Sequence, residues 1–160
     1  MPTDFRRILR LLLDHDVDFI VVGALSSVLQ GAPVSTFDID IVHERSRDNV
    51  DRLSQVLAEL NARYRGPGDR ELALDPEGLM GQGHHLFETD AGPLDVLGEI
   101  EEQFSYEDLL DDSVELDFDG RSVRVLSLAR YVDFVSGSDR PKDQARLAVL
   151  RETLDQTDDD

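Results

Sequence analysis

Residues 18–64 alternate between hydrophobic runs of strand length and segments of helical periodicity, and this alternation restricts the fold more than any other feature. Residues 18–23 (DFIVVG) form an apolar run that ends in glycine, which predicts a buried strand. We expect a short helix over residues 24–30, a second strand over residues 36–43 (TFDIDIVH) and a long amphipathic helix over residues 46–64. This order is typical of chains that combine a sheet with helices.

The rest of the chain adds further strands and helices. Candidate helix caps are Thr3, Ser46 and the capping-box pair Ser105 and Asp108, and residues 119–120 (DG) predict the turn of a hairpin. Residues 66–82 are rich in glycine and predict a loop. The other expected elements are strands over residues 85–90, 93–98 and the 114–126 hairpin, and helices over residues 5–13, 106–112, 127–137 and 141–154. We therefore predict an α+β fold, a small mixed β-sheet flanked by helices, with helices at its C-terminus.

Composition predicts one domain. A chain of 160 residues that is 40% hydrophobic can bury roughly 70% of its unfolded surface, so we expect a single domain over residues 1–160. The acidic end, residues 155–160 (DQTDDD), is expected to be a disordered tail. The chain has no cysteine and no apolar run of membrane-spanning length, so we expect a cytoplasmic protein with no membrane partner.

The charge balance excludes one class of partner. The formal net charge is -19, and Lys142 is the only lysine. Such a field repels phosphate backbones at long range, so extended DNA binding is not expected. Arg63, Arg65 and Arg70 are expected to be solvated, at positions from which they could touch an RNA or nucleotide phosphate.

The stretch FDIDIV, residues 37–42, places two like charges inside an apolar run. Alternate side chains of a strand point to the same face, so Asp38 and Asp40 share a face and repel unless solvent or a cation lies between them. A third carboxylate, Asp95, lies within another predicted strand. Three carboxylates that converge from two strands form an all-oxygen site suited to Mg²⁺. A solvent-facing strand edge is the competing interpretation.

Two other Asp-x-Asp chemistries fit less well. An EF-hand calcium loop that began at Asp38 would need an oxygen ligand, a glycine and an acid where the chain has Val42, His43 and Asn49. That option fails. A phosphatase of the haloacid-dehalogenase type is compatible with Val42, but the apolar run that should precede Asp38 is missing.

Three blocks carry a family resemblance: residues 18–42, residues 92–99 (GPLDVLGE) and residues 127–154, which contain RPKD. Together they resemble the nucleotidyltransferase superfamily of the DNA polymerase beta type. More narrowly, they are similar to the minimal prokaryotic nucleotidyltransferases related to the AbiEii abortive-infection toxins. The resemblance extends from residue 17 to about residue 150 and is weakest over residues 66–82.

The resemblance implies a site and a reaction. It implies that Asp38, Asp40 and Asp95 are catalytic and bind Mg²⁺, with two ions expected, and that Asp95 deprotonates the attacking hydroxyl. The nucleoside triphosphate substrate, for which ATP is one choice, would lie against the turn at Gly23 and Ala24. The hydroxyls of Ser26 and Ser27, and the cations of Arg140 and Lys142, would also contact its phosphates.

The resemblance also implies the acceptor and the partners. A nucleoside monophosphate would pass to a hydroxyl of a tRNA, a protein or a small molecule, and the chain would be part of a toxin-antitoxin or phage-defence pair with a cognate antitoxin. Two positions depart from the family pattern, because Phe37 and Val135 stand where relatives often carry cations. These departures keep an alternative open, a catalytically weak domain of the same fold that binds a nucleotide or a partner.

Overall fold

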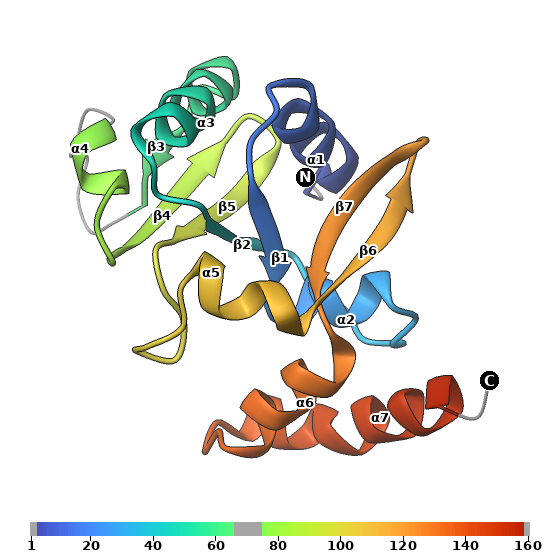
Figure 1. The fold of residues 1–160 in the computed structure, drawn as a ribbon. Helices are drawn as coiled ribbons and strands as arrows, with labels where there is room; N and C mark the ends of the chain where they lie inside the picture. The colour runs from blue at the N-terminus through green and yellow to red at the C-terminus, as the bar shows by residue number, and fades with distance from the viewer. Residues whose placement is uncertain (1–2, 66–74, 159–160) are drawn as a thin grey trace.

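The computed structural model describes residues 3–65 and 75–158 and contains a seven-stranded mixed sheet (Figure 1). The strands are β1 (Phe19–Val22), β2 (Ile39–His43), β3 (Arg63–Tyr64), β4 (His84–Thr89), β5 (Gly92–Leu97), β6 (Ser113–Phe118) and β7 (Arg121–Leu126). Their order across the sheet is β3-β4-β5-β2-β1-β7-β6. The pairs β1–β7 and β2–β5 are parallel, and the other neighbours are antiparallel. The predicted α+β fold with a mixed sheet is confirmed.

Helices precede, connect and follow the strands. They are α1 (Phe5–Asp14), α2 (Gly23–Leu29), α3 (Arg47–Glu59), α4 (Pro76–Leu79), α5 (Tyr106–Leu109) with the 3-10 turn η1 (Leu110–Asp112), α6 (Leu128–Ser136) and α7 (Pro141–Asp158). In Figure 1, α6 and α7 lie side by side beyond the end of β7. None of the described helices is long and apolar enough to cross a membrane.

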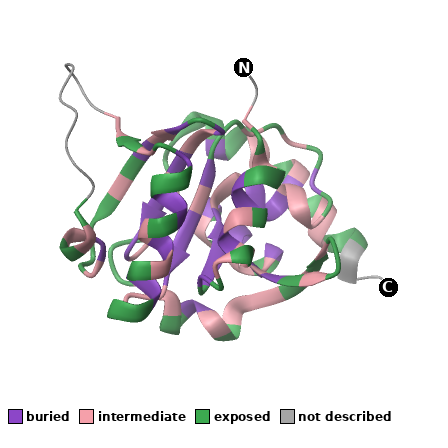
Figure 2. Ribbon diagram, turned by 90° about the horizontal axis from the view of Figure 1, so that it is seen from above, coloured by how far each residue is buried: buried purple, intermediate pink, exposed green. Residues whose placement is uncertain are grey.

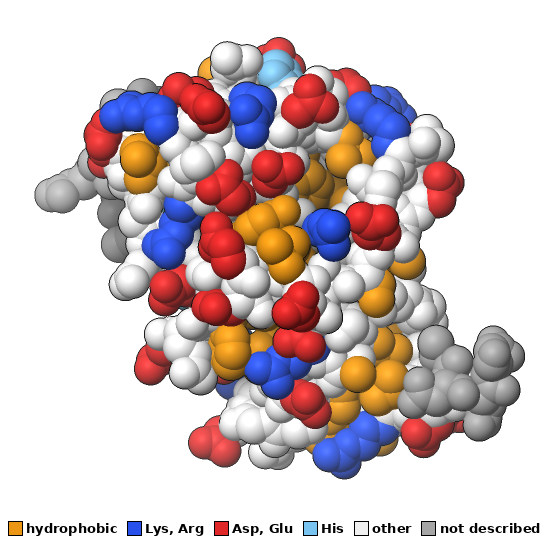
Figure 3. Space-filling view, in the orientation of Figure 1, with side chains coloured by type: hydrophobic (Ala, Val, Ile, Leu, Met, Phe, Trp, Pro, Cys, Tyr) orange, Lys and Arg blue, Asp and Glu red, His pale blue; other side chains and the backbone are white. Residues whose placement is uncertain are grey.

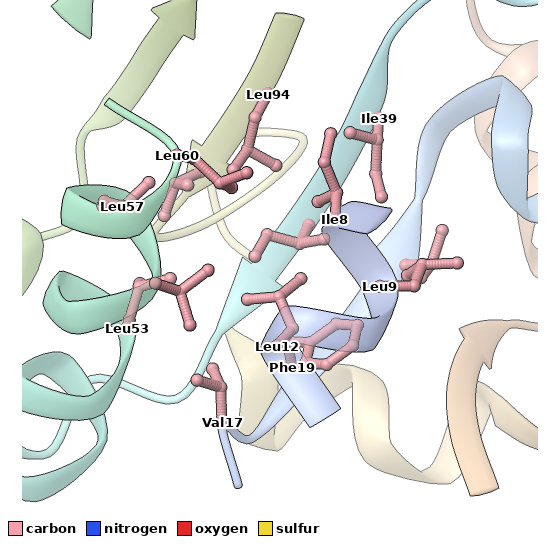
Figure 4. Packing of buried hydrophobic residues seen from close by; sticks show 14 of the residues in the cluster. Ile8, Leu9, Leu12, Val17, Phe19, Ile39, Leu53, Leu57, Leu60 and Leu94 are labelled. Carbon is pink, nitrogen blue, oxygen red and sulfur yellow. The ribbon is translucent and has the colours of Figure 1, made fainter. Parts of the chain in front are cut away.

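The larger core lies between one face of the sheet and helices α1 and α3. Ile39 of β2 points to this face and is fully buried, as are Leu12 of α1 and Leu53 of α3. Figure 4 shows these side chains packed against each other. Each such burial stabilises the fold by about 1.5–3 kcal/mol relative to an exposed side chain. Figure 2 shows the same pattern, because the strands in the middle of the sheet are mostly buried.

A second core covers the opposite face and fixes the positions of α5, α6 and α7. Ile20 and Val42 contribute from β1 and β2, because they alternate with the residues of the first core. Leu109 of α5, Val135 of α6 and Leu150 of α7 complete the cluster. Asp40 and Asp95 lie on this second face, so the helices that cover it also determine how far the carboxylates are shielded from water.

Most of the predicted signals for turns and caps are confirmed. Ser46 caps α3 by accepting a hydrogen bond from the amide of Asn49, and Ser105 and Asp108 form the predicted capping box of α5. Asp119 and Gly120 both have positive φ, as the hairpin turn requires.

Three predictions at segment ends are wrong. Asp4, not Thr3, caps α1 by accepting a hydrogen bond from the amide of Arg7, while the Thr3 hydroxyl donates to the Phe37 carbonyl. The strand β3 occupies the end of the expected long helix, and α4 lies in the expected loop; residues 66–74 of that loop lie outside the described residues. The helix α7 continues to Asp158 and so includes residues 155–158 of the expected tail; residues 159–160 are also outside the described part.

Candidate active site

Two neighbouring parallel strands bring the first pair of carboxylates together. In the register of β2 and β5, Asp40 lies directly opposite Asp95. Their side chains therefore point to the same face of the sheet. Asp38 is exposed and lies one residue before β2. The structure thus brings Asp40 and Asp95 together on one face, and Asp38 lies just before the start of β2.

The surroundings of Asp40 disfavour its charged form. Its pKa is raised to about 8: burial is the largest cause, a hydrogen bond with the Asp95 side chain and the negative charges of Asp95 and Asp38 act in the same direction, and the charge of Arg65 opposes them. The Oδ1 atom of Asp40 is buried and has no hydrogen-bond partner. A half-buried carboxyl with a buried, unpaired oxygen and like charges beside it is electrostatically suited to a cation.

The turn at Gly23 lies against this carboxylate. Gly23 has φ +70, and a Cβ atom added there would overlap the Oδ2 atom of Asp40. Glycine is needed at this position both because of its left-handed backbone and because the backbone approaches the carboxylate so closely. Gly23 and Ala24 both line the cleft described below.

Substitution of Gly23 tests this close approach. The variant Gly23→Ala is expected to lose at least about 1–2 kcal/mol of unfolding free energy from the left-handed backbone alone, and to displace Asp40. Gly31→Ala is the matched control, because Gly31 also has positive φ (+100) but no atom within 4 Å of an added Cβ. Thermal unfolding should show a loss in both variants and a larger one at Gly23. Equal losses would contradict the close-approach argument.

A cleft of about 860 Å³ opens where the carboxylates lie, between the ends of β1 and β2 and the helices α6 and α7. Asp38 and Asp40 line it, whereas Asp95 does not. The cations on its wall are Arg130, Arg140, Lys142 and Arg146, together with His84. Acidic side chains on its wall, besides the two aspartates of β2 and its approach, are Glu101, Asp133 and Asp143.

Three residues of the RPKD segment, Arg140, Lys142 and Asp143, line this cleft. Arg140 donates through Nε to the Oδ2 atom of Asp143 at 2.8 Å, and the Ser138 hydroxyl donates to the same oxygen at 2.6 Å. The Arg140 side chain is 81% exposed and Lys142 is exposed, so both remain accessible to an anion in the cleft. Asp143 is buried and orients Arg140.

Two cleft cations were not predicted from the sequence. Arg146 donates to the backbone carbonyl of Ser35 at 2.7 Å, which joins α7 to the segment that precedes Asp38. It lies four residues after Lys142, and this spacing places both on one side of a helix, which was the available signal. Arg130 lies over the rings of Phe104 and Phe134, at 4.9 and 4.7 Å from their centroids. No short motif indicates that sandwich.

Other predicted residues are placed differently from the prediction. Ser26 and Ser27 are fully buried and donate their hydroxyl hydrogens to the carbonyls of Gly23 and Ala24, both at 2.6 Å, so their hydroxyls do not reach the cleft. Phe37, for which no placement was predicted, is 73% exposed.

The structure also shows where Val135 lies, and it places two of the three arginines that were expected to be solvated. Val135 belongs to the second core and also lines the cleft. Arg63 is exposed, but Arg65 is ion-paired with Asp95. Arg70 lies outside the described residues.

Comparison with known proteins identifies the family. A profile of the aminoglycoside-2''-adenylyltransferase family matches residues 4–150. The chain belongs to this family. The predicted membership of the nucleotidyltransferase superfamily, and of an enzyme class that transfers nucleotides, is thereby confirmed. The narrower AbiEii-like assignment stays a prediction. Comparison with curated proteins finds no matching sequence.

Solved structures of adenylyltransferases share the fold. The lincosamide adenylyltransferase LnuA, in its lincomycin-bound crystal structure, is similar with a TM-score of 0.65 and 16% identity over 95% of this chain and 98% of that chain. The crystal structure of ANT(2'')-Ia in complex with adenylyl-2''-tobramycin has a TM-score of 0.58 and 16% identity over 92% of this chain and 86% of that chain. At these identities the likeness is one of fold.

Proposed function

We propose that the chain transfers a nucleoside monophosphate from a nucleoside triphosphate, with ATP as the first candidate, to a hydroxyl group of a small molecule. The observation that carries this proposal is the Asp40–Asp95 pair, aligned on adjacent parallel strands next to the Gly23 turn and the cleft. The family to which the chain belongs supports the adenylyl donor. The similar structures contain lincomycin and adenylyl-2''-tobramycin, which supports a small-molecule acceptor.

Each residue of the site has a separate role in the proposed transfer. The acceptor oxygen attacks the α-phosphorus, the bond from that phosphorus to the leaving oxygen breaks, and pyrophosphate departs. We assign the proton of the acceptor hydroxyl to the carboxylate of Asp95. Arg140 and Lys142, and with them Arg146, bind and orient the phosphates from the α7 side of the cleft. The backbone at Gly23 and Ala24 faces the phosphates from the opposite side.

The carboxylates fit a divalent cation. The unpaired buried oxygen of Asp40 and the charges of Asp38 and Asp95 form a set of oxygen donors of the kind that Mg²⁺ prefers. Within residues 3–65 and 75–158, however, no three His, Asp or Glu side chains are already arranged to hold a metal ion. We therefore propose that at least one Mg²⁺ binds here and that the carboxylates rearrange around it. When bound, the ion would neutralise charge on the phosphate oxygens.

Two acids on the cleft wall, in addition to Asp143 and the aspartates of β2 and its approach, favour a cationic acceptor. Glu101 and Asp133 line the cleft together with the carboxylates of the centre. Acidic side chains also outnumber Lys and Arg in the chain, 35 to 16, and Figure 3 shows them spread over one face of the molecule, interspersed with basic side chains. Opposite charge raises the encounter rate and local concentration of a positively charged ligand, so aminoglycosides, which carry several amino groups, are the first acceptors to test.

A labelled-transfer experiment tests the function. The purified full-length chain is incubated with Mg²⁺, with each α-labelled nucleoside triphosphate in turn and with an aminoglycoside, a lincosamide or total RNA. We expect label to pass from ATP to the aminoglycoside, and mass spectrometry to find one added nucleoside monophosphate. Transfer to RNA alone would instead support the tRNA acceptor and the toxin-antitoxin role, which stay predictions. Nucleotide binding without transfer to any acceptor would support the binding-module alternative.

A further inference from the structure

Arg65 forms an ion pair with the carboxylate that we assign as proton acceptor. Its Nη2 atom contacts the Oδ1 atom of Asp95, and the two side chains are only 29% and 16% exposed. The backbone holds Arg65 in this place, because its amide donates to the carbonyl of Leu86 at 2.8 Å and Leu86 lies opposite Asp95 in the register of β4 and β5. The contact is therefore built into the sheet.

The charge of Arg65 also acts on the other carboxylate of the pair. Around Asp40, burial and the two neighbouring aspartates disfavour ionisation, and Arg65 is the positive group that opposes them. Cleft cations such as Arg140 and Arg146 are engaged elsewhere, with Asp143 and with Ser35. Arg65 thus supplies the positive charge next to Asp40 and Asp95 in the described structure.

The ion pair also accounts for the position of Asp95. Asp38 and Asp40 line the cleft, but Asp95 does not, and in the described part of the chain three acidic groups are not arranged around a common point. One oxygen of Asp95 is occupied by a guanidinium instead. A divalent ion that required this oxygen would have to displace Arg65 from it.

We propose that Arg65 is a positioning residue, an internal counter-ion that holds Asp95 and competes with the divalent metal for it. Arg65 thereby sets how tightly the carboxylate centre binds metal. This inference rests on the proposed function for the existence of a metal site. It adds Arg65, which directly follows β3, to a centre otherwise built from β2, β5 and the Gly23 turn.

The competition has a definite sign. Removing a fixed positive charge within contact distance of a ligand carboxylate strengthens the attraction between that carboxylate and a cation. The variant Arg65→Gln should therefore bind Mn²⁺, used as a spectroscopic probe for Mg²⁺, at least about fivefold more tightly than the wild type. Arg65→Lys keeps the charge and should remain close to the wild type.

Mn²⁺ titration of the full-length chain, followed by electron paramagnetic resonance, measures these affinities. Arg63→Gln is the matched control, because Arg63 lies two residues earlier, is exposed, and its side chain donates to the carbonyl of Asn61 rather than to a carboxylate of the centre. Its affinity should equal that of the wild type. In an Asp95→Asn background, Arg65→Gln should tighten binding much less, because Arg65 and the metal no longer compete for a charged ligand and only the effect of Arg65 on Asp40 is left. Thermal unfolding without metal, recorded for every variant, identifies any that do not fold.

The outcomes separate this inference from the proposed function. The inference is supported if Arg65→Gln binds Mn²⁺ more tightly, while Arg65→Lys stays close to the wild type and Arg63→Gln is unchanged. Unchanged or weaker binding in a folded Arg65→Gln variant overturns it, provided that Asp40→Asn still weakens Mn²⁺ binding. If Asp40→Asn also leaves Mn²⁺ binding unchanged, the metal site itself is refuted, and the proposed function fails with it.

Discussion

Replacing Asp40 with asparagine is expected to reduce nucleotidyl transfer by at least about a thousandfold. The substitution keeps the size of the side chain but removes the negative charge that Asp40, opposite Asp95 and with a buried unpaired oxygen, would carry when a cation is bound. Without that charge the phosphate oxygens lose their cation, and the attacking and leaving groups lose their alignment. The measurement is the rate of label transfer from α-labelled ATP to the preferred acceptor at saturating Mg²⁺.

The control for this experiment is Asp117→Asn. Asp117 is an exposed carboxylate on β6, at the edge of the sheet away from β2 and β5, and its replacement removes the same charge from the chain. Its rate should remain within about twofold of the wild type. A folded Asp40→Asn protein that transferred at the wild-type rate would remove Asp40 from the reaction.

The second large effect is a pH-dependent loss of stability that belongs to Asp40. Its pKa is raised from 3.8 to about 8, mainly by burial and then by Asp95 and Asp38. Between these values the folded chain holds a proton that the unfolded chain has lost. The stabilisation is complete below the unfolded pKa, declines as the pH rises and is lost once the pH passes about 8.

Denaturant unfolding without metal, at about pH 5 and about pH 8.5, measures this effect. The wild type should lose roughly 4 kcal/mol relative to Asp40→Asn between the two conditions. Mg²⁺ should restore more stability at the higher pH, because at the lower pH it must displace a proton from Asp40. Parallel curves for the wild type and Asp40→Asn would contradict the raised pKa, and Asp117→Asn should follow the wild type.

The sequence predicted the carboxylate pair because a strand has a period of two and parallel neighbours hold a fixed register. The pattern FDIDIV places Asp38 and Asp40 on one face, and the apolar flanks of Asp95 predict a second buried strand. The structure then pairs Asp40 with Asp95. The Gly23 turn could be predicted for a similar reason, since a glycine at the end of an apolar run marks a backbone that other residues cannot adopt.

Other parts of the site depend on contacts between distant residues, which no local pattern encodes. The serines after Gly23 were predicted to face phosphate, but helical rotation buries Ser26 and Ser27, and their hydroxyls donate to backbone carbonyls of the same helix. The short strand β3 is too brief to show a period, so the ion pair between Arg65 and Asp95, thirty residues apart, could not be predicted.

Crystals soaked with Mn²⁺ and a non-hydrolysable ATP analogue would test the central claim most directly, by the position of the anomalous scattering peak. We expect the peak in contact with Asp38 and Asp40, with Asp95 turned toward it from Arg65, and the triphosphate between the Gly23 turn and the cations of α7. A peak bound only by acids elsewhere, such as Glu101 and Asp133, or a triphosphate outside the cleft, would contradict the account.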